Sequence, residues 1–87
     1  MLDYSTLDED LHGSMRRYID GRIQPGSFLT AVLSNDLKEA CACADMRNRG
    51  RLFAIVSWLY NEAPSHCWGS PEKVRLWLAD RARKDIP

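Results

Sequence analysis

The chain has 87 residues, of which 45% are hydrophobic and 28% are charged, and its 12 basic and 12 acidic side chains cancel. This length suits one domain, and the composition excludes an intrinsically disordered chain, which needs fewer apolar residues and a larger net charge. Dedicated nucleic-acid binders usually carry a basic excess, and the chain has none. We therefore expect one globular domain over residues 1–87, with direct nucleic-acid binding disfavoured. Neutrality also favours a homodimer, because it removes the repulsion between copies.

The first helix is predicted from about Thr6 to Asp20, because five large apolar residues recur on one helical face. Ser5 or Thr6 is expected to cap it, and Gly21 is expected to end it in the left-handed conformation. A proline-glycine turn separates it from a short second helix over residues 27–33. Asp36 has capping-box spacing with Glu39, so the third helix is predicted from there to about Asp45.

Residues 46–48 are predicted to be a junction, followed by a fourth helix from about Asn48 to Glu62. This helix has the most apolar residues, so we place it at the centre of the fold, with Trp58 near the edge of its apolar stripe. Serine, proline and glutamate at residues 70–72 give a strong start signal for a fifth helix, in which Trp77 is expected in the core. Residues 85–87 are expected to fray. No strand pattern is present, so the predicted fold is all-α, a compact orthogonal bundle of about five short helices.

The three cysteines, Cys41, Cys43 and Cys67, do not form a convincing metal site. Residues two apart on a helix point in different directions, and zinc ligands normally sit two to four residues apart on a turn. His66 or His12 beside a cysteine could suggest a nucleophile and its base, but no supporting motif accompanies them. We therefore expect no metal, no cofactor and no enzymatic activity.

The location in the cell is predicted from the same residues. An odd cysteine count fits free thiols in a reducing compartment. The N-terminus lacks the basic and apolar regions of a signal peptide, and no stretch approaches a membrane span. We expect a cytoplasmic protein that does not associate with membranes.

Two charged groups and one tryptophan are candidate partner-binding residues. Asp8, Glu9 and Asp10 could favour the start of a helix, or they could dock into a basic protein groove. Arg47 and Arg51 share a helix face and could contact phosphates, or they could belong to a solvated surface. Trp68 precedes a helix cap, where it could pack over the helix start or act as an interface hot spot.

Several segments together resemble a family of short, uncharacterised proteins encoded in phages and prophages of proteobacteria. These segments are Met15–Ile19, Pro25–Leu33 (PGSFLTAVL), Asp36–Ala40 (DLKEA), Leu59–Pro64 (LYNEAP) and Cys67–Val74 (CWGSPEKV). The resemblance extends from about His12 to Leu78. Small accessory phage proteins of this size often act by binding and blocking a host protein, as anti-CRISPR and other anti-defence inhibitors do.

The resemblance implies a non-enzymatic phage protein in the bacterial cytoplasm that binds and inhibits a host protein or ribonucleoprotein defence complex. The alternative is a small nucleic-acid-binding regulatory protein. The two differ in their charges, because a regulator needs a contiguous basic face, whereas an inhibitor can act through acidic and apolar surface.

Overall fold

The computed structural model describes the backbone of residues 2–84 and the side chains of residues 2–80. This part of the chain is all-α. It holds five α-helices and one short 3₁₀ helix, and no strand. In chain order the elements are α1 (Glu9–Gly21), α2 (Ser27–Leu33), α3 (Leu37–Cys43), α4 (Met46–Glu62), η1 (Ser65–Cys67) and α5 (Pro71–Lys84).

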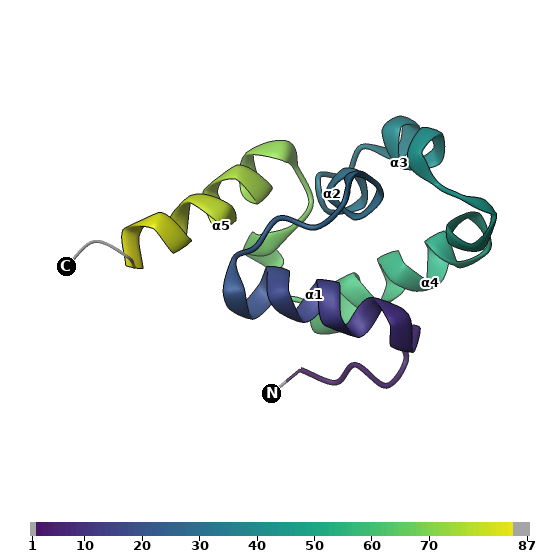
Figure 1. The fold of residues 1–87 in the computed structure, drawn as a ribbon, viewed down its shortest axis with the longest axis horizontal. Helices are drawn as coiled ribbons and strands as arrows, with labels where there is room; N and C mark the ends of the chain where they lie inside the picture. Colours follow the sequence, from purple (N-terminus) through teal and green to yellow (C-terminus); the bar gives the residue numbers. More distant parts are fainter. Residues whose placement is uncertain (1, 85–87) are drawn as a thin grey trace.

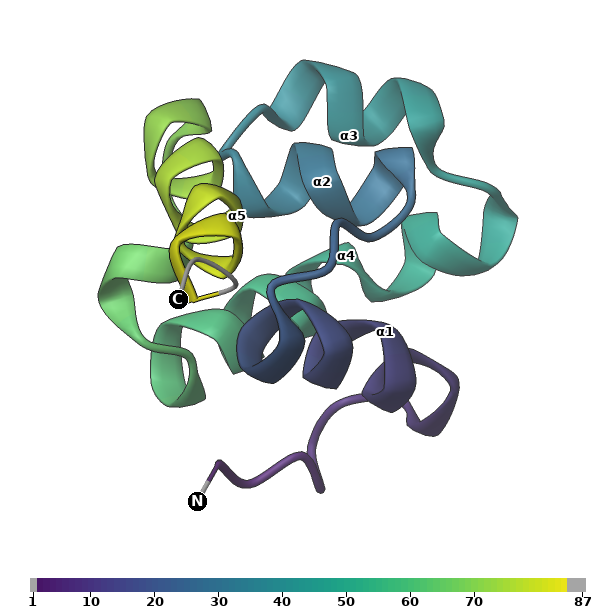
Figure 2. The same ribbon diagram turned by 60° about the vertical axis from the view of Figure 1, so that its left-hand side comes forward.

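The helices cross at steep angles, as the orthogonal arrangement requires (Figure 1). That view looks down α2, while α1 and α5 run across it. Figure 2 shows α2 and α3 side by side and α1 against α4, and Figure 1 shows α5 extending away from the other helices toward the C-terminus. The radius of gyration is 12.6 Å, close to the roughly 12 Å expected for a compact domain of this size. The predicted small helical bundle is confirmed.

The core lies where α1, α2 and α4 meet, and three aromatic side chains connect distant parts of the chain there. Tyr18 on α1 donates its hydroxyl to the Cys67 carbonyl at 2.7 Å. Trp58 on α4 donates Nε1–H to the Asp3 carbonyl at 2.7 Å, and Trp77 on α5 donates to the Tyr18 carbonyl at 3.0 Å. Each bond satisfies the polar atom of a large aromatic side chain that is buried in the core or packed against it.

Most helix boundaries follow the capping signals in the sequence. α2 covers the predicted residues, and the Asp36 carboxylate accepts from the Glu39 backbone N–H at 3.1 Å at the start of α3. At α5, the Ser70 hydroxyl accepts from the Lys73 N–H, also at 3.1 Å, and Pro71 is the first helical residue. These predictions are confirmed. Each cap stabilises its helix start, because it satisfies a backbone N–H group that has no partner within the helix.

The predicted ends of α1 were wrong at both sides. The helix begins at Glu9, so Asp8 is the N-cap rather than Ser5 or Thr6. At the C-terminus Arg22, not Gly21, adopts the left-handed conformation, with φ of 56°. Arg22 donates its backbone N–H to the Tyr18 carbonyl, which is the bond of the αL motif, and Ile23 donates to the Arg17 carbonyl. The Arg22 side chain compensates the backbone strain through contacts with α5 that glycine could not make.

The junction predicted at residues 46–48 was also wrong. α3 ends at Cys43, and α4 already begins at Met46. The Asp45 carboxylate caps α4 by accepting from the Asn48 N–H at 2.7 Å. The two helices are therefore separated by two residues only.

The tryptophans differ from their predicted places. Trp58 is buried in the core rather than at the edge of the α4 stripe, and Trp77 is only half-buried. The predicted fraying of residues 85–87 lies outside the described residues. Among the helices of the described part, none is long and apolar enough to cross a membrane.

Candidate functional site

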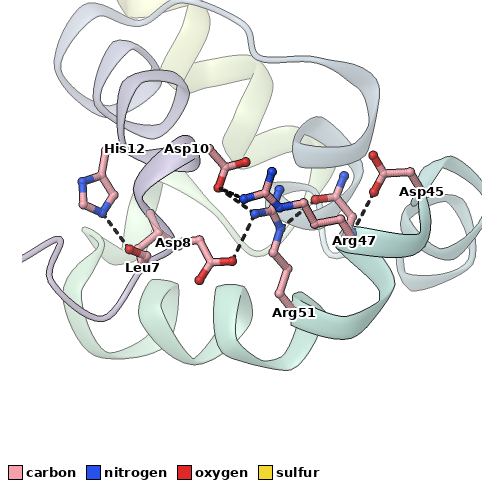
Figure 3. Close-up of polar contacts among 8 residues, drawn as sticks. Leu7, Asp8, Asp10, His12, Asp45, Arg47 and Arg51 are labelled. Atoms are coloured by element: carbon pink, nitrogen blue, oxygen red, sulfur yellow. Dashed lines mark hydrogen bonds and ion pairs between the residues drawn. The ribbon is translucent and has the colours of Figure 1, made fainter.

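The candidate acidic and basic residues lie next to each other, where the N-terminus of α1 meets the N-terminus of α4 (Figure 3). The Arg51 Nη1 atom is 3.1 Å from Asp8 Oδ2 and 2.8 Å from Asp10 Oδ1. Arg47 Nη2 lies 3.4 Å from the same Asp10 oxygen. We call these four residues the charge cluster. The two charged groups that the sequence offered as separate docking surfaces are bound to each other.

Local sequence explains why the charge cluster forms. Asp8 and Asp10 stand at the N-cap and in the first turn of α1, where the helix dipole favours anions. Arg51 lies on the first turns of α4, and its Nε–H donates to Asn48 Oδ1 at 2.9 Å. Its side chain is only 11% exposed. The aliphatic part of the side chain therefore packs into the bundle, while the guanidinium N–H groups donate to two carboxylates and one amide oxygen. The charge cluster thus joins α1 to α4 through hydrogen bonds between residues 43 and 41 positions apart in the chain.

The ion pairs of the charge cluster shift the pKa values of Asp10 and Arg51. The hydrogen bond and charge of Arg51 hold the pKa of Asp10 below its usual range. The same bond raises the pKa of Arg51, with a further contribution from Asp8. Glu9 is exposed and has no part in these ion pairs. Of the acidic candidates it alone presents a carboxylate that the cluster does not neutralise.

Two of the residues considered for catalysis, Cys67 and His12, are buried or hydrogen-bonded within the fold. The Cys67 thiol is buried, and burial raises its pKa to about 11, so it stays protonated at neutral pH. His12 uses Nε2 for a 2.7 Å hydrogen bond with the Leu7 carbonyl (Figure 3). Within the described residues, no three histidine, cysteine or acidic side chains are grouped so that they could hold a metal ion. These side chains are parts of the framework around α1 and η1.

Trp68 packs partly buried against the core, which is the structural alternative considered for it. The backbone that follows holds it there, because Gly69 donates its N–H to the Leu33 carbonyl at the end of α2 at 2.7 Å. Gly69 has φ of 115°, a conformation that side-chain-bearing residues rarely adopt. This backbone bond links the end of α2 to the start of α5 beside Trp68.

The described surface is hollowed around Trp77, which the sequence placed in the core. Two open hollows, of about 530 and 680 Å³, share the Trp77 side chain between α1 and α5. We call them together the Trp77 groove. The first is lined by Arg22, His66, Lys73, Leu76, Trp77, Ala79 and Asp80, and the second by Leu2, Tyr4, Arg16, Ile19, Asp20, Pro64 and Trp77.

Two stacked arginines hold the aromatic walls of this groove in place. The Arg22 guanidinium carbon lies 3.4 Å from the centre of the Trp77 ring system, and its Nη1 atom is 3.0 Å from Asp80 Oδ2. Arg16 covers the Tyr4 ring at 4.6 Å. Cation–π stacking favours this arrangement. The groove thus presents aromatic and guanidinium surfaces, with Lys73 and Leu76 exposed on its rim.

Comparisons with protein families, with curated proteins and with solved structures give no match to this chain.

Proposed function

We propose that this protein is a non-enzymatic inhibitor of phage origin, which binds a protein component of a bacterial host defence complex through the Trp77 groove. The observation that carries the proposal is the composition of the groove. Tryptophan, tyrosine and arginine are the residues most enriched among interface hot spots, and here Arg22 lines one hollow and Tyr4 and Arg16 line the other, with Trp77 shared by both.

The charges of the groove indicate the chemistry of the partner segment. Arg16 and Lys73 form no ion pair with another described side chain, whereas Arg22 is already bound to Asp80. The exposed Leu76 adds an apolar contact beside Lys73. A partner segment with apolar and acidic side chains matches these groups, because a carboxylate can pair with a rim cation while its neighbours cover the rings.

The charge cluster is a weaker candidate for the same role. Asp8 and Asp10 are bound to Arg51 and Arg47, so an approaching basic surface would have to compete with arginines that are already in place. Removing Arg51 would also disturb the contact between α1 and α4. The phage setting and the defence complex rest on the resemblance of the sequence, to which the groove adds a way of binding protein.

The proposal is tested with matched pairs of variants. Leu76→Asp and Lys73→Glu change the rim of the groove. Leu37→Asp and Lys38→Glu make the same changes at exposed positions on α3. The tagged chain is used to capture its partner from bacterial lysate, and the partner is then purified for titration. We expect the two groove variants to raise Kd at least about tenfold, as loss of a hot spot does, and the two α3 variants to leave it unchanged.

A second measurement tests inhibition. Bacteria that carry an active defence system are infected with a sensitive phage while they express the chain. The wild-type chain and the α3 variants should raise the number of plaques, and Leu76→Asp should not. Equal plaque numbers with and without the chain in every defence background would contradict the proposal. So would micromolar binding to duplex DNA that weakens steeply with salt, which indicates phosphate contacts and would favour the regulatory alternative.

A further inference from the structure

The outer side of α4, away from the core, carries large apolar side chains in contact with solvent. Met46 is 86% exposed, Phe53 85% and Tyr60 80%, and Val56 is 37% exposed. Isolated exposed apolar residues are ordinary on protein surfaces, but a contiguous set marks an interaction site. We call these four residues, together with the exposed Arg49, the outer face of α4.

The spacing of these residues is that of a helix-pairing seam. Met46, Arg49, Phe53, Val56 and Tyr60 follow one another in steps of three, four, three and four residues. This is the alternation of the a and d positions of a heptad repeat, which keeps side chains in line toward a second helix. The opposite side of α4 already packs into the core through Ile55, Trp58 and Leu59. A second apolar side on a helix that already packs into the core is a candidate for a second packing partner.

We infer that the outer face of α4 is covered by the same face of a second copy of this chain, with the two α4 helices antiparallel. A two-fold axis passing between residues 54 and 55 places Phe53 opposite Val56 of the second copy. The same axis places Arg49 opposite Tyr60 of the second copy, where the guanidinium can stack on the ring. Each contact occurs twice, as two-fold symmetry requires. The seam is therefore complementary to itself, including its one charged residue.

The area involved is enough for a weak dimer. An aromatic side chain buries roughly 150–250 Å², so Phe53 and Tyr60 with Met46 and Val56 present on the order of 500 Å² per copy. Two copies thus remove about 1,000 Å² from water, the lower end of the range for specific interfaces. The zero net charge of the chain adds no repulsion between the copies.

Sedimentation equilibrium over micromolar to millimolar concentrations of the full chain tests this dimer. The average mass should rise from 10.0 kDa toward twice that value. Phe53→Asp should weaken association at least about tenfold, because it places a carboxylate in the apolar seam. The matched control, Leu76→Asp, lies in the Trp77 groove and should leave the dimer unchanged. Conversely, loss of partner binding in Leu76→Asp tests the proposed function without affecting the dimer.

A residue exchange tests the antiparallel register. Tyr60→Arg places two arginines opposite each other, and Arg49→Tyr removes the cation, so each single variant should associate more weakly. The double variant Arg49→Tyr with Tyr60→Arg restores one ring and one cation in each contact, and it should recover most of the association. A mass of 10.0 kDa at every concentration would overturn the inference. Failure of the double variant to recover, with both single variants folded by circular dichroism, would also overturn it.

Discussion

The two sides of α4 contain similar residues in opposite surroundings. Ile55, Trp58 and Leu59 on the inner side are almost completely buried, whereas Phe53 and Tyr60 on the outer side are mostly in contact with solvent. Hydrophobicity alone therefore does not decide which side of this helix faces the core. Position relative to α1 and to the N-terminal segment decides it, because these elements supply the packing partners and the Asp3 carbonyl that accepts from Trp58.

The largest expected effect comes from truncating the inner side of α4. Leu59 is fully buried, so Leu59→Ala should reduce the free energy of unfolding by about 2–5 kcal/mol, the cost of a core cavity. Phe53→Ala is the matched control and should change the stability of the monomer by no more than about 0.5 kcal/mol. Urea denaturation of dilute samples measures both. Equal losses would mean that the two sides of α4 are not different.

A smaller effect of opposite sign is expected on the outer side. A Cβ atom at Gly50 would meet no other atom within 4 Å. Glycine within a helix is less favourable than alanine by roughly 0.5–1 kcal/mol, so Gly50→Ala should stabilise the monomer by about that amount. Thermal unfolding in the Phe53→Asp background measures this without self-association. A destabilised variant would show that this side of α4 is packed against something within the monomer.

The smallest effect concerns the charge cluster, which lies at the edge between the two sides of α4. The folded state lowers the pKa of Asp10, so the charged carboxylate contributes stability above the unfolded pKa of about 3.9. That contribution is lost as the pH falls through the lower, folded value. Wild type should exceed Asp10→Asn in stability at pH 6, and the difference should shrink as the pH falls below about 3.9. Glu9→Gln, outside the cluster, is the control, and a constant difference across this range would contradict the assigned ion pair.

Much of the fold was predictable because short capping signals act locally. Asp36 with Glu39, and Ser70 with Pro71, mark helix starts through contacts within four residues. The ends that were mispredicted depend on contacts far along the chain. Arg22 replaces Gly21 at the end of α1 because Trp77 and Asp80 hold its side chain, and no local pattern around residue 22 announces this. At α4 the signal was present, since Asp45 stands three residues before Asn48 and caps the helix, but Asp45 was assigned to the end of the third helix.

The candidate sites also divide into features with a local sequence signal and features that depend on contacts far along the chain. The sequence identified Asp8, Asp10, Arg47 and Arg51 as charged groups of interest, but only the packing of α1 on α4 shows that they bind one another. The Trp77 groove had no sequence signal, because Trp77 occupies an inward position on α5 and so reads as core. The exposed heptad spacing of α4 was visible in the sequence, although it could not be separated from the inner stripe before one side was known to be buried.

The hydrogen bonds of the tryptophans also have a consequence for biosynthesis. Trp58 bonds to Asp3, 55 residues earlier, and Trp77 bonds to Tyr18, 59 residues earlier. At a synthesis rate of about 5–20 residues per second, Asp3 and Tyr18 wait roughly 3–12 s for their partners to be made. During that time the Asp3 and Tyr18 carbonyls lack their hydrogen-bond donors, and α1 lacks the helices that bury its apolar side. A nascent chain of this protein should therefore stay open to proteases and chaperones until α4 and then α5 have been synthesised.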